Sequence, residues 1–453
     1  MSDEDFGREE SRLGGRIRRY ARVGTSVGGL AAQVVGSRYL GLNLDRGQHS
    51  SDLRAALGGL KGPLMKAAQI LATIPDALPP EYAEDLRQLQ SNAPAMGWPF
   101  VKRRMRSELG PDWQKNFKSF GHAAAAAASL GQVHEAIGLD GRHLACKLQY
   151  PDMQSAVEAD LQQLKILFGI YRRYDRAIDP SNIFAELSDR LREELDYHRE
   201  ARHMELYRIM LAGEAGVEVP EPVHALSGER LLTMTWLEGE SLMAFLERTD
   251  DVGQRNQVAM NMFRAWYVPF YYYGVIHGDP HLGNYTLRED GRVNLLDFGC
   301  IRVFDPRFVK GVIDLYFALE RNDEALAVQA YESWGFTNIS KDLLDALNIW
   351  AKFLYAPLLE DKPQPIMEGE GGMYGARVAN EVHRELKRLG GVRPPREFVL
   401  MDRAAIGLGS VFMHLKAEIN WHRLFHEMIA GFDVDRLRER QRESLTAVGL
   451  SPP

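Results

Sequence analysis

Two aspartates, an asparagine and two histidines lie close together in HGDPHLGN (277–284) and LLDFG (295–299). Phosphoryl transfer needs one carboxylate near the attacking oxygen, and a second carboxylate with an amide oxygen to hold magnesium on the phosphates. Asp279 can supply the first carboxylate, whereas Asn284 and Asp297 can supply the metal ligands. The two segments therefore predict phosphoryl-transfer chemistry.

The same chemistry needs a cation on the phosphate oxygens and an acid that fixes this cation. Lys147 lies in HLACKLQ, which follows the turn signal LDGR at 139–142. We therefore expect a β-hairpin with Lys147 on its second strand. The acidic stretch REELDYHREA at 192–201 is expected to form one helix that supplies the acid.

The spacing of these polar residues is that of a protein kinase. Five positions separate Asp279 from Asn284 and thirteen separate Asn284 from Asp297, as between a kinase catalytic loop and its Asp-Phe-Gly motif. A strand lysine, an Asp-Phe-Gly turn or a loop histidine such as His277 is, alone, most often structural. The ordered set of all these motifs is what predicts the function.

The phosphate loop departs from the kinase pattern. Protein kinases place a glycine-rich loop between their first two strands, whereas this chain has AAAAAASLGQVH at 123–134. Alanine restricts backbone angles that glycine permits, so we expect a different nucleotide geometry, with contacts from Ala127, Ala128 and Ser129. The sequence contains no GxxxxGK[ST] motif, which argues against a P-loop ATPase.

Composition excludes several other classes of protein. The chain has 453 residues, 45% of them hydrophobic, and a net charge of -7, which argues against a nucleic-acid partner. Its two cysteines, Cys146 and Cys300, cannot build a disulfide framework or a zinc site and are expected to be small core residues. No apolar run reaches eighteen residues, and the acidic N-terminus is no secretory signal. A cytoplasmic protein is expected.

The pattern along the chain predicts an α+β fold with two lobes. Residues 1–50 form a leader in which a basic segment precedes an apolar one. This leader can lie on an anionic membrane surface, or it can be a solvated helix that packs on its own domain. We expect the remaining domains to be a helical extension at 51–112, a β-rich lobe at 113–238 and a helical lobe at 239–453.

More local expectations follow from turn residues and periodicity. Residues 220–237 are expected to be strand, 275–303 to be a loop and hairpin with a turn at 288–292, and 304–453 to be helical.

On these motifs the chain resembles the UbiB (AarF-domain) atypical kinases over roughly residues 55–300. That resemblance implies a protein-kinase-like fold whose N-terminal helical extension packs over the active site. KAAQ at 66–69 is similar to the family's lysine–x–glycine–glutamine motif, and the family's ExD motif falls on Glu194 and Asp196. Lys66 would then pair with Glu194, and Gln69 would point toward the phosphates, so that these residues gate the site.

The resemblance also indicates the ion-pair partner of Lys147 and the positions at which this sequence differs from the family's pattern. Glu200 is the expected partner of Lys147. Residues 193, 196 and 200 would also share one helical face, so Glu193 could substitute for Glu194. Ala68 stands where the family has glycine, which favours helix and could change how closely the motif approaches the nucleotide. SNAP at 91–94 replaces an expected acidic residue, and Gly278 stands where alanine is commoner.

The family's roles imply ATP or ADP with Mg²⁺ as cofactors. Lys147, Glu200 and Asp279 would be catalytic, and the activity would be that of an ATPase or a small-molecule or lipid kinase. The implied setting is isoprenoid-lipid (ubiquinone) metabolism at a membrane. The implied partners are an anionic membrane surface and an isoprenoid-quinone precursor or lipid-synthesis enzymes.

Three alternatives remain open from the sequence. A phosphotransferase of the aminoglycoside or choline kinase type shares the HGD-x4-N pattern, although KAAQ and the alanine loop speak against it. A pseudokinase could act as a nucleotide-gated scaffold for lipid-synthesis enzymes without turnover. A non-enzymatic helical protein could bind membranes through residues 12–36.

Overall fold

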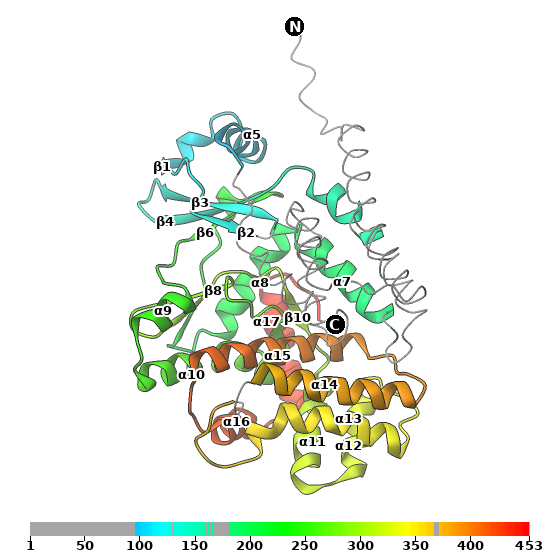
Figure 1. The fold of residues 1–453 in the computed structure, drawn as a ribbon. Helices are drawn as coiled ribbons and strands as arrows, with labels where there is room; N and C mark the ends of the chain where they lie inside the picture. The colour runs from blue at the N-terminus through cyan, green and yellow to red at the C-terminus, as the bar shows by residue number, and fades with distance from the viewer. Residues whose placement is uncertain are drawn as a thin grey trace, which may run out of the picture.

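The computed structural model describes residues 96–128, 130–159, 161–162, 165, 179, 181–366 and 371–452. These residues form a small β-rich lobe and a larger helical lobe, so the predicted bilobal, kinase-like α+β fold is confirmed (Figure 1). The leader at 1–50, the motif residues Lys66 and Gln69, and Ser129 lie outside the described residues. The domain boundaries stay predictions.

Five described strands form the antiparallel sheet of the small lobe, in the order β1-β3-β4-β6, with β2 paired to β3. The strands are β1 (Phe117–Phe120), β2 (Ala126–Ala128), β3 (Gly131–Gly138), β4 (His143–Gln149) and β6 (Leu231–Thr235). The predicted hairpin is confirmed, because β3 and β4 pair across the turn at 139–142, where Gly141 has a φ of 85°. Lys147 lies on β4 as expected.

Helix α5 (Trp98–Leu109) covers this sheet and gives the small lobe a core of its own. Val101 and Met105 on α5 are fully buried and belong to one cluster with Cys146 and Leu148 of β4. The short 3-10 helix η3 (Trp113–Asn116) leads from α5 into β1. Cys146 is therefore a small core residue, as expected from its sequence context.

The expectation of strand across 220–237 was partly wrong. Residues 231–235 form β6, but His224–Leu226 is a 3-10 helix, η4, and Pro222 makes a single bridge to Met234. Two prolines in this stretch, Pro220 and Pro222, carry no backbone N–H and cannot donate to a ladder.

The expectation of one acidic helix over 192–201 was also wrong. Helix α7 (Ser181–Glu193) ends before this stretch is complete, and α8 (Tyr197–Met210) begins after a turn. The side chain of Asp196 accepts a hydrogen bond of 2.9 Å from the backbone N–H of Arg199, so it caps α8 and starts a new helix. Glu193 and Glu200 therefore belong to different helices.

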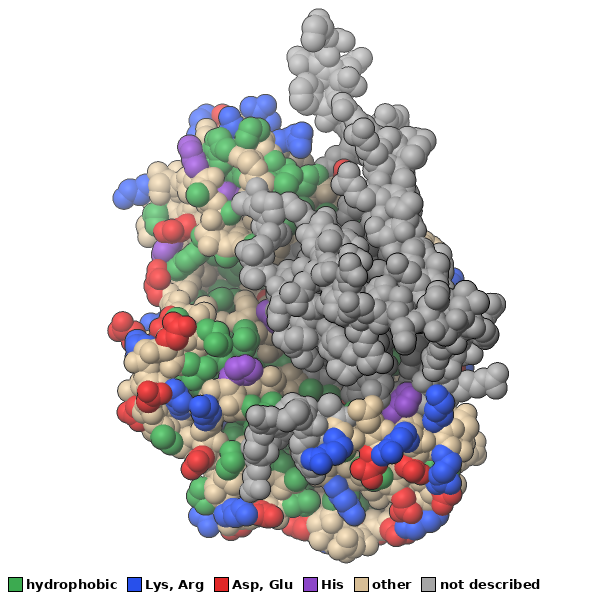
Figure 2. All heavy atoms as spheres, viewed as in Figure 1, with side chains coloured by type: hydrophobic (Ala, Val, Ile, Leu, Met, Phe, Trp, Pro, Cys, Tyr) green, Lys and Arg blue, Asp and Glu red, His purple; other side chains and the backbone are tan. Residues whose placement is uncertain are grey.

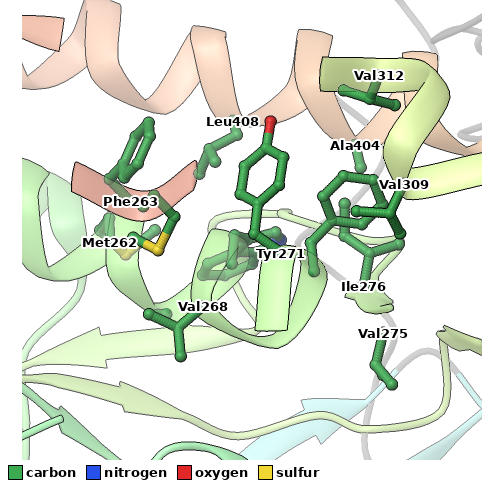
Figure 3. Packing of buried hydrophobic residues seen from close by; sticks show 14 of the residues in the cluster. Met262, Phe263, Val268, Tyr271, Val275, Ile276, Val309, Val312, Ala404 and Leu408 are labelled. Carbon is green, nitrogen blue, oxygen red and sulfur yellow. The ribbon is translucent and has the colours of Figure 1, made fainter. Parts of the chain in front are cut away.

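The helical lobe is built around the long helix α10 (Val252–Tyr273). Figure 3 shows its core, where Met262, Phe263, Val268 and Tyr271 of α10 pack with side chains of β7, α11 and α15. Helix α9 (Leu242–Arg248) precedes α10 in the chain. The helices that confirm the helical prediction for 304–453 are α11 (Pro306–Arg321), α12 (Glu324–Ser333), α13 (Lys341–Tyr355), the 3-10 helix η5 (Ala356–Leu358), α14 (Gly371–Arg388), α15 (Arg396–Leu415), α16 (Trp421–Ile429) and α17 (Val434–Ala447).

Short strands at the lobe junction carry the candidate site. They are β5 (Val217–Glu218), β7 (Val275–His277), β8 (Tyr285–Leu287), β9 (Val293–Leu295) and β10 (Ile301–Val303). Helix α10 ends at Gly274, whose φ of 64° is left-handed and whose added Cβ would lie 2.6 Å from Gln441 Nε2, so glycine is required where the chain turns into β7. The predicted hairpin at 288–292 is confirmed by the antiparallel pairing of β8 with β9.

Helix α15 packs against the loop that follows β7. An added Cβ at Gly407 would lie 2.5 Å from Pro280 Cγ, so this helix contacts the loop closely because it has glycine there. By length and composition, α15 is the one helix of the described chain apolar enough to cross a membrane, and 44% of its apolar window is buried in the protein.

On the face drawn in Figure 2, basic side chains gather over α5, and acidic and basic side chains are mixed over the lower helices.

Candidate active site

The pairing of β7 with β10 brings the two polar loops together. His277 at the end of β7 lies opposite Ile301 of β10, so the loop at 278–284 and the turn at 297–299 leave the same pair of strands. Because β7 and β10 are antiparallel, the loop that leaves the end of β7 begins beside the turn that leads into β10. His277 and Asp297, which are 20 positions apart, therefore meet because this two-stranded sheet joins their segments.

His277 ties these two loops to each other. Its Nδ1 accepts a hydrogen bond of 3.1 Å from the backbone N–H of Asp279, and its Nε2 lies 2.7 Å from the carbonyl oxygen of Asp297. The backbone N–H can only donate and the carbonyl can only accept, so His277 is neutral with its proton on Nε2. The side chain is fully buried, which agrees with the expectation that it supports the loop backbone.

Asn284 is held at the other end of the loop. The side-chain Nδ2 of Asn284 donates to the backbone carbonyl oxygen of Asp279 across 2.9 Å. The backbone carbonyl of Asn284 accepts from the N–H of Leu296 across 2.9 Å. Because the amide nitrogen is committed to the loop, the orientation of the amide group is fixed. The amide oxygen is then available on the opposite side of the group, where a metal ligand is expected.

Lys147 joins the small lobe to the helical lobe. Its Nζ lies 2.6 Å from Glu200 Oε1 and 3.0 Å from Asp297 Oδ2. The expected ion pair between Lys147 and Glu200 is therefore present. Burial alone lowers the pKa of Lys147, but the carboxylates of Asp297 and Glu200 outweigh burial and raise it well above its usual value. The lysine consequently stays protonated between two carboxylates.

The Asp-Phe-Gly turn is held mainly through its backbone. Oδ1 of Asp297 accepts from the N–H of Gly299 across 3.0 Å, and His203 Nδ1 lies 3.1 Å from the carbonyl oxygen of Phe298. Burial lowers the pKa of His203 to about 3, so this imidazole is neutral and donates to the carbonyl. Glu194 lies against the turn, because an added Cβ at Gly299 would be 3.4 Å from its Cγ.

The carboxylate of Glu193 is held by two arginines, and whether Glu193 or Glu194 pairs with Lys66 stays a prediction, because Lys66 lies outside the described residues. The Glu193 carboxylate accepts from Arg302 Nη1 across 2.9 Å and lies 2.8 Å from Arg199 Nη1. The neighbouring Glu186, only 6% exposed, is bonded by Arg302, and also by Arg190 and Arg396. This ion-pair network fastens α7 to β10 and α15 directly behind the Asp-Phe-Gly turn.

The alanine-rich segment is only partly a loop. Ala126–Ala128 form strand β2, in which Ala127 pairs with Gln132 and Ala128 pairs with Gly131. Ala127 is exposed and Ala128 is half-buried, so both remain accessible at the tip of the small-lobe sheet. Residues 126–128 of the expected alanine-rich loop are therefore strand, paired to β3.

Two residues of α8 support the site and were missed in the sequence. Tyr197 lies under Lys147, whose Nζ is 5.4 Å from the centre of the ring, and His203 holds Phe298. Both lie three residues from Glu200, on the same face of the helix. The three-residue spacing was a usable signal once Glu200 had been chosen.

The segment that joins the lobes, residues 236–240, was also missed. Asn294 Nδ2 donates to the carbonyl oxygen of Glu238 across 2.9 Å, and the N–H of Glu240 donates to Leu287. An added Cβ at Gly239 would lie 2.5 Å from Thr286 Oγ1, so only glycine fits this close approach. The linker is thereby held against β8 and β9, the hairpin between the two polar loops.

The donor set fits magnesium bound together with phosphates. Asn284 and Asp297 offer an amide oxygen and a carboxylate, which are ligands suited to a hard cation. Among the described residues, no group of three or more histidine, cysteine, aspartate or glutamate side chains could hold a metal ion by itself. Magnesium here would take its remaining ligands from phosphate oxygens and water, as it does in kinase sites.

The chain is similar to known atypical kinases. Residues 88–331, more than half of the chain, match the ABC1 atypical kinase-like domain. The chain is 26% identical over 384 residues to "Atypical kinase coq-8, mitochondrial" of Caenorhabditis elegans, covering 83% of this chain and 50% of that protein. It is 28% identical over 252 residues to "Atypical kinase COQ8, mitochondrial" of Saccharomyces cerevisiae, covering 55% and 50%. The matches thus span about half the length of these relatives.

A solved structure covers nearly the same extent. The complex of Rv3197 with erythromycin from Mycobacterium tuberculosis has a TM-score of 0.58 and 26% identity, covering 85% of this chain and 96% of that one.

Proposed function

Since the chain belongs to the ABC1 atypical kinase-like family, we propose that it binds a magnesium–nucleotide between its lobes and transfers or hydrolyses the terminal phosphoryl group. The observation that carries this proposal is Lys147 between Glu200 and Asp297, at 2.6 and 3.0 Å. Kinase chemistry requires the same lysine–glutamate pair and the same metal-binding aspartate.

Each side chain has a distinct part in the proposed reaction. Lys147, oriented by Glu200, neutralises phosphate oxygens, while Asn284 and Asp297 hold the metal. Magnesium, when bound, neutralises charge on the phosphates. Ala127 and Ala128 would border the phosphates with backbone groups, in place of a glycine-rich loop.

Asp279 serves the attacking oxygen in this proposal. It is 8% exposed, its N–H is bonded to His277, and its carbonyl is bonded to Asn284. A backbone held on both sides gives the carboxylate a defined position, which general-base or positioning catalysis requires. The acceptor oriented by Asp279 is either water or a hydroxyl group of a small molecule or lipid.

The proposed setting is isoprenoid-lipid metabolism at a membrane, with ubiquinone as the end product. Two relatives named for COQ8 support this setting at the level of the family. The arginine-rich segment at 12–24 supports contact with an anionic surface. Lys66, Gln69, Glu194 and Asp196 would gate access to the nucleotide, with Glu194 already beside Gly299.

Thermal stabilisation by Mg-ATP and by Mg-ADP tests the nucleotide site. The wild-type chain is expected to be stabilised by either nucleotide only with magnesium, and Asp297→Asn is expected to lose that effect. Asp250→Asn is a matched control, because the side chain of Asp250 is fully exposed on the helical lobe. Equal stabilisation of wild type and Asp297→Asn would refute the site.

ATP hydrolysis with and without anionic vesicles tests the membrane setting. Turnover that rises with vesicles and disappears in Asp297→Asn supports a membrane-coupled enzyme. Magnesium-dependent nucleotide binding without turnover in either condition would instead support a nucleotide-gated scaffold.

A further inference from the structure

The helical lobe contains a cavity of about 240 Å³ that the proposed reaction does not use. Its wall is formed mainly by aromatic and aliphatic side chains of α10, α11, α13, α14 and α15. Helix α15 separates the cavity from the candidate active site, because it has Gly407 against Pro280 and has Asp402 and Ala405 in the cavity wall.

One carboxylate lies in this apolar wall. Oδ1 of Asp402 accepts a hydrogen bond of 2.6 Å from the indole N–H of Trp350. Among the described residues, no lysine, arginine or histidine forms an ion pair with Asp402. Burial raises the pKa of Asp402 to about 7, although the Trp350 hydrogen bond opposes this shift. An ionisable group without a cation costs free energy in the unliganded protein.

A second polar group ends in the same region. Tyr271 is 3% exposed, and Figure 3 shows its ring rising from α10 with the hydroxyl directed toward Leu408 of α15. Tyr271 also lines the cavity, so its hydroxyl is a second polar group in the same apolar wall as Asp402. A hydroxyl in an apolar cavity wall can form a hydrogen bond with a bound ligand.

Aromatic rings stand beside the carboxylate. Trp350 and Phe353 of α13 have ring centroids 5.2 Å apart, and Tyr355 and Phe398 also line the cavity. Aromatic faces attract cations, and a carboxylate in the same low-dielectric space strengthens that attraction. Phe353 is only partly buried, so the wall on the α13 side reaches toward the surface.

We propose that this cavity binds a small organic amine, whose apolar body packs on the aromatic wall and whose ammonium group pairs with Asp402. The volume sets the size of the ligand, because a cavity of roughly 150 Å³ holds one benzene molecule. A single ring with a short alkylamine chain therefore fits a cavity of about 240 Å³. A hydroxyl on such a ligand would meet Tyr271.

Calorimetric titration of the full chain with phenethylamine and with 2-phenylethanol tests the proposal. The two probes share ring and chain, and only the amine is charged. At about pH 8 the wild type is expected to bind the amine at least about tenfold more tightly than the alcohol. Asp402→Asn, which keeps the shape and the Trp350 bond, is expected to lose that preference while still binding the alcohol.

A cavity-filling variant locates the binding. Ala405→Phe places a ring into the cavity from α15 and is expected to abolish binding of both probes, while Mg-ATP stabilisation persists. The proposal is overturned if the folded wild type binds neither probe. It is also overturned if Asp402→Asn keeps the preference for the amine, or if Ala405→Phe binds both probes as well as the wild type does. Stabilisation by Mg-ATP depends on residues that lie on the other side of α15 from the cavity. A failure of the proposed function would therefore appear as a loss of this stabilisation, separately from the binding of the two probes.

Discussion

His277 Nε2 donates a hydrogen bond to the carbonyl oxygen of Asp297 across 2.7 Å, while its Nδ1 accepts from the N–H of Asp279 across 3.1 Å. One neutral imidazole thereby sets the position of the two candidate catalytic aspartates relative to each other. Both bonds are to backbone groups, so the side chain acts by placing the loops. Its complete burial means that water cannot replace it.

Replacing His277 with phenylalanine is expected to lower both stability and turnover. The ring volume is kept, but a buried carbonyl and a buried N–H lose their partner, at about 1–3 kcal/mol each. ATP turnover should fall more than about tenfold, because misplacement of a catalytic group by about 1 Å costs roughly a hundredfold. Urea unfolding and steady-state hydrolysis measure the two effects. His414→Phe, at an exposed position, is the control, and unchanged turnover in His277→Phe would contradict the positioning role.

Removing the charge of Lys147 is expected to destabilise the protein through the carboxylates that remain. Lys147→Met leaves Glu200, 2% exposed, facing Asp297 without a cation, at about 3–5 kcal/mol. Lys147→Met/Glu200→Gln should recover part of this loss, because one of the two carboxylates is neutralised. Urea unfolding of these two variants and of Glu200→Gln alone, beside the exposed control Lys118→Met, measures the coupling. A double variant as unstable as the sum of its single changes would contradict a coupled pair.

Much of this site could be predicted from the sequence, because kinase chemistry depends on residue types at set spacings. The hairpin with Lys147 and the loop at 277–284 follow from local turn signals and short motifs, and the Glu200 pair follows from the resemblance to the family. These features are short in range or fixed by chemistry that few residue types can perform.

Other features depend on contacts that a single sequence does not encode locally. The helix break before α8 depends on Asp196, which could equally have been a surface acid in a continuous helix. Glu193 is bonded by Arg302, 109 positions away, and no local pattern in the sequence marks that contact. The cavity at Asp402 is formed by helices that are distant in sequence, and no motif marks it.

Asp402→Asn is expected to stabilise the protein at high pH. Burial raises the pKa of Asp402 from 3.8 to about 7, so the folded chain binds this proton more tightly than the unfolded chain does. Its contribution to stability is complete below about pH 4 and is lost as pH rises through about 7. The full shift corresponds to at most about 4 kcal/mol.

Urea unfolding at about pH 4, 6 and 8 measures this dependence. Asp402→Asn should exceed the wild type at about pH 8, and the difference should shrink as pH falls. His383 of α14 also lines the cavity, but it is present in both the wild type and Asp402→Asn. The difference between the two proteins therefore reports on Asp402. Asp250→Asn, at a fully exposed position, should show no such pH-dependent difference. A variant no more stable than wild type at high pH would contradict burial of the carboxylate.

Gly278→Ala is expected to disturb the site through Cys300. An added Cβ would lie 3.2 Å from Cys300 Sγ and 3.4 Å from its carbonyl oxygen, which accepts the N–H of Gly278 across 2.7 Å. Alanine should therefore push β7 away from β10, at about 1–3 kcal/mol. ATP turnover should fall with stability, because Asp279 is the next residue.

The double variant Gly278→Ala/Cys300→Ala shows whether this contact is the cause. Removing Sγ leaves room for the new methyl group, so the double variant should be more stable than the two single changes together predict. Gly213→Ala is the matched control, because nothing lies within 4 Å of its added Cβ. Urea unfolding and hydrolysis follow all four variants. If Cys300→Ala gives no recovery in either measurement, the Sγ contact is not the cause, and the added methyl group acts instead through the carbonyl oxygen of Cys300 at 3.4 Å.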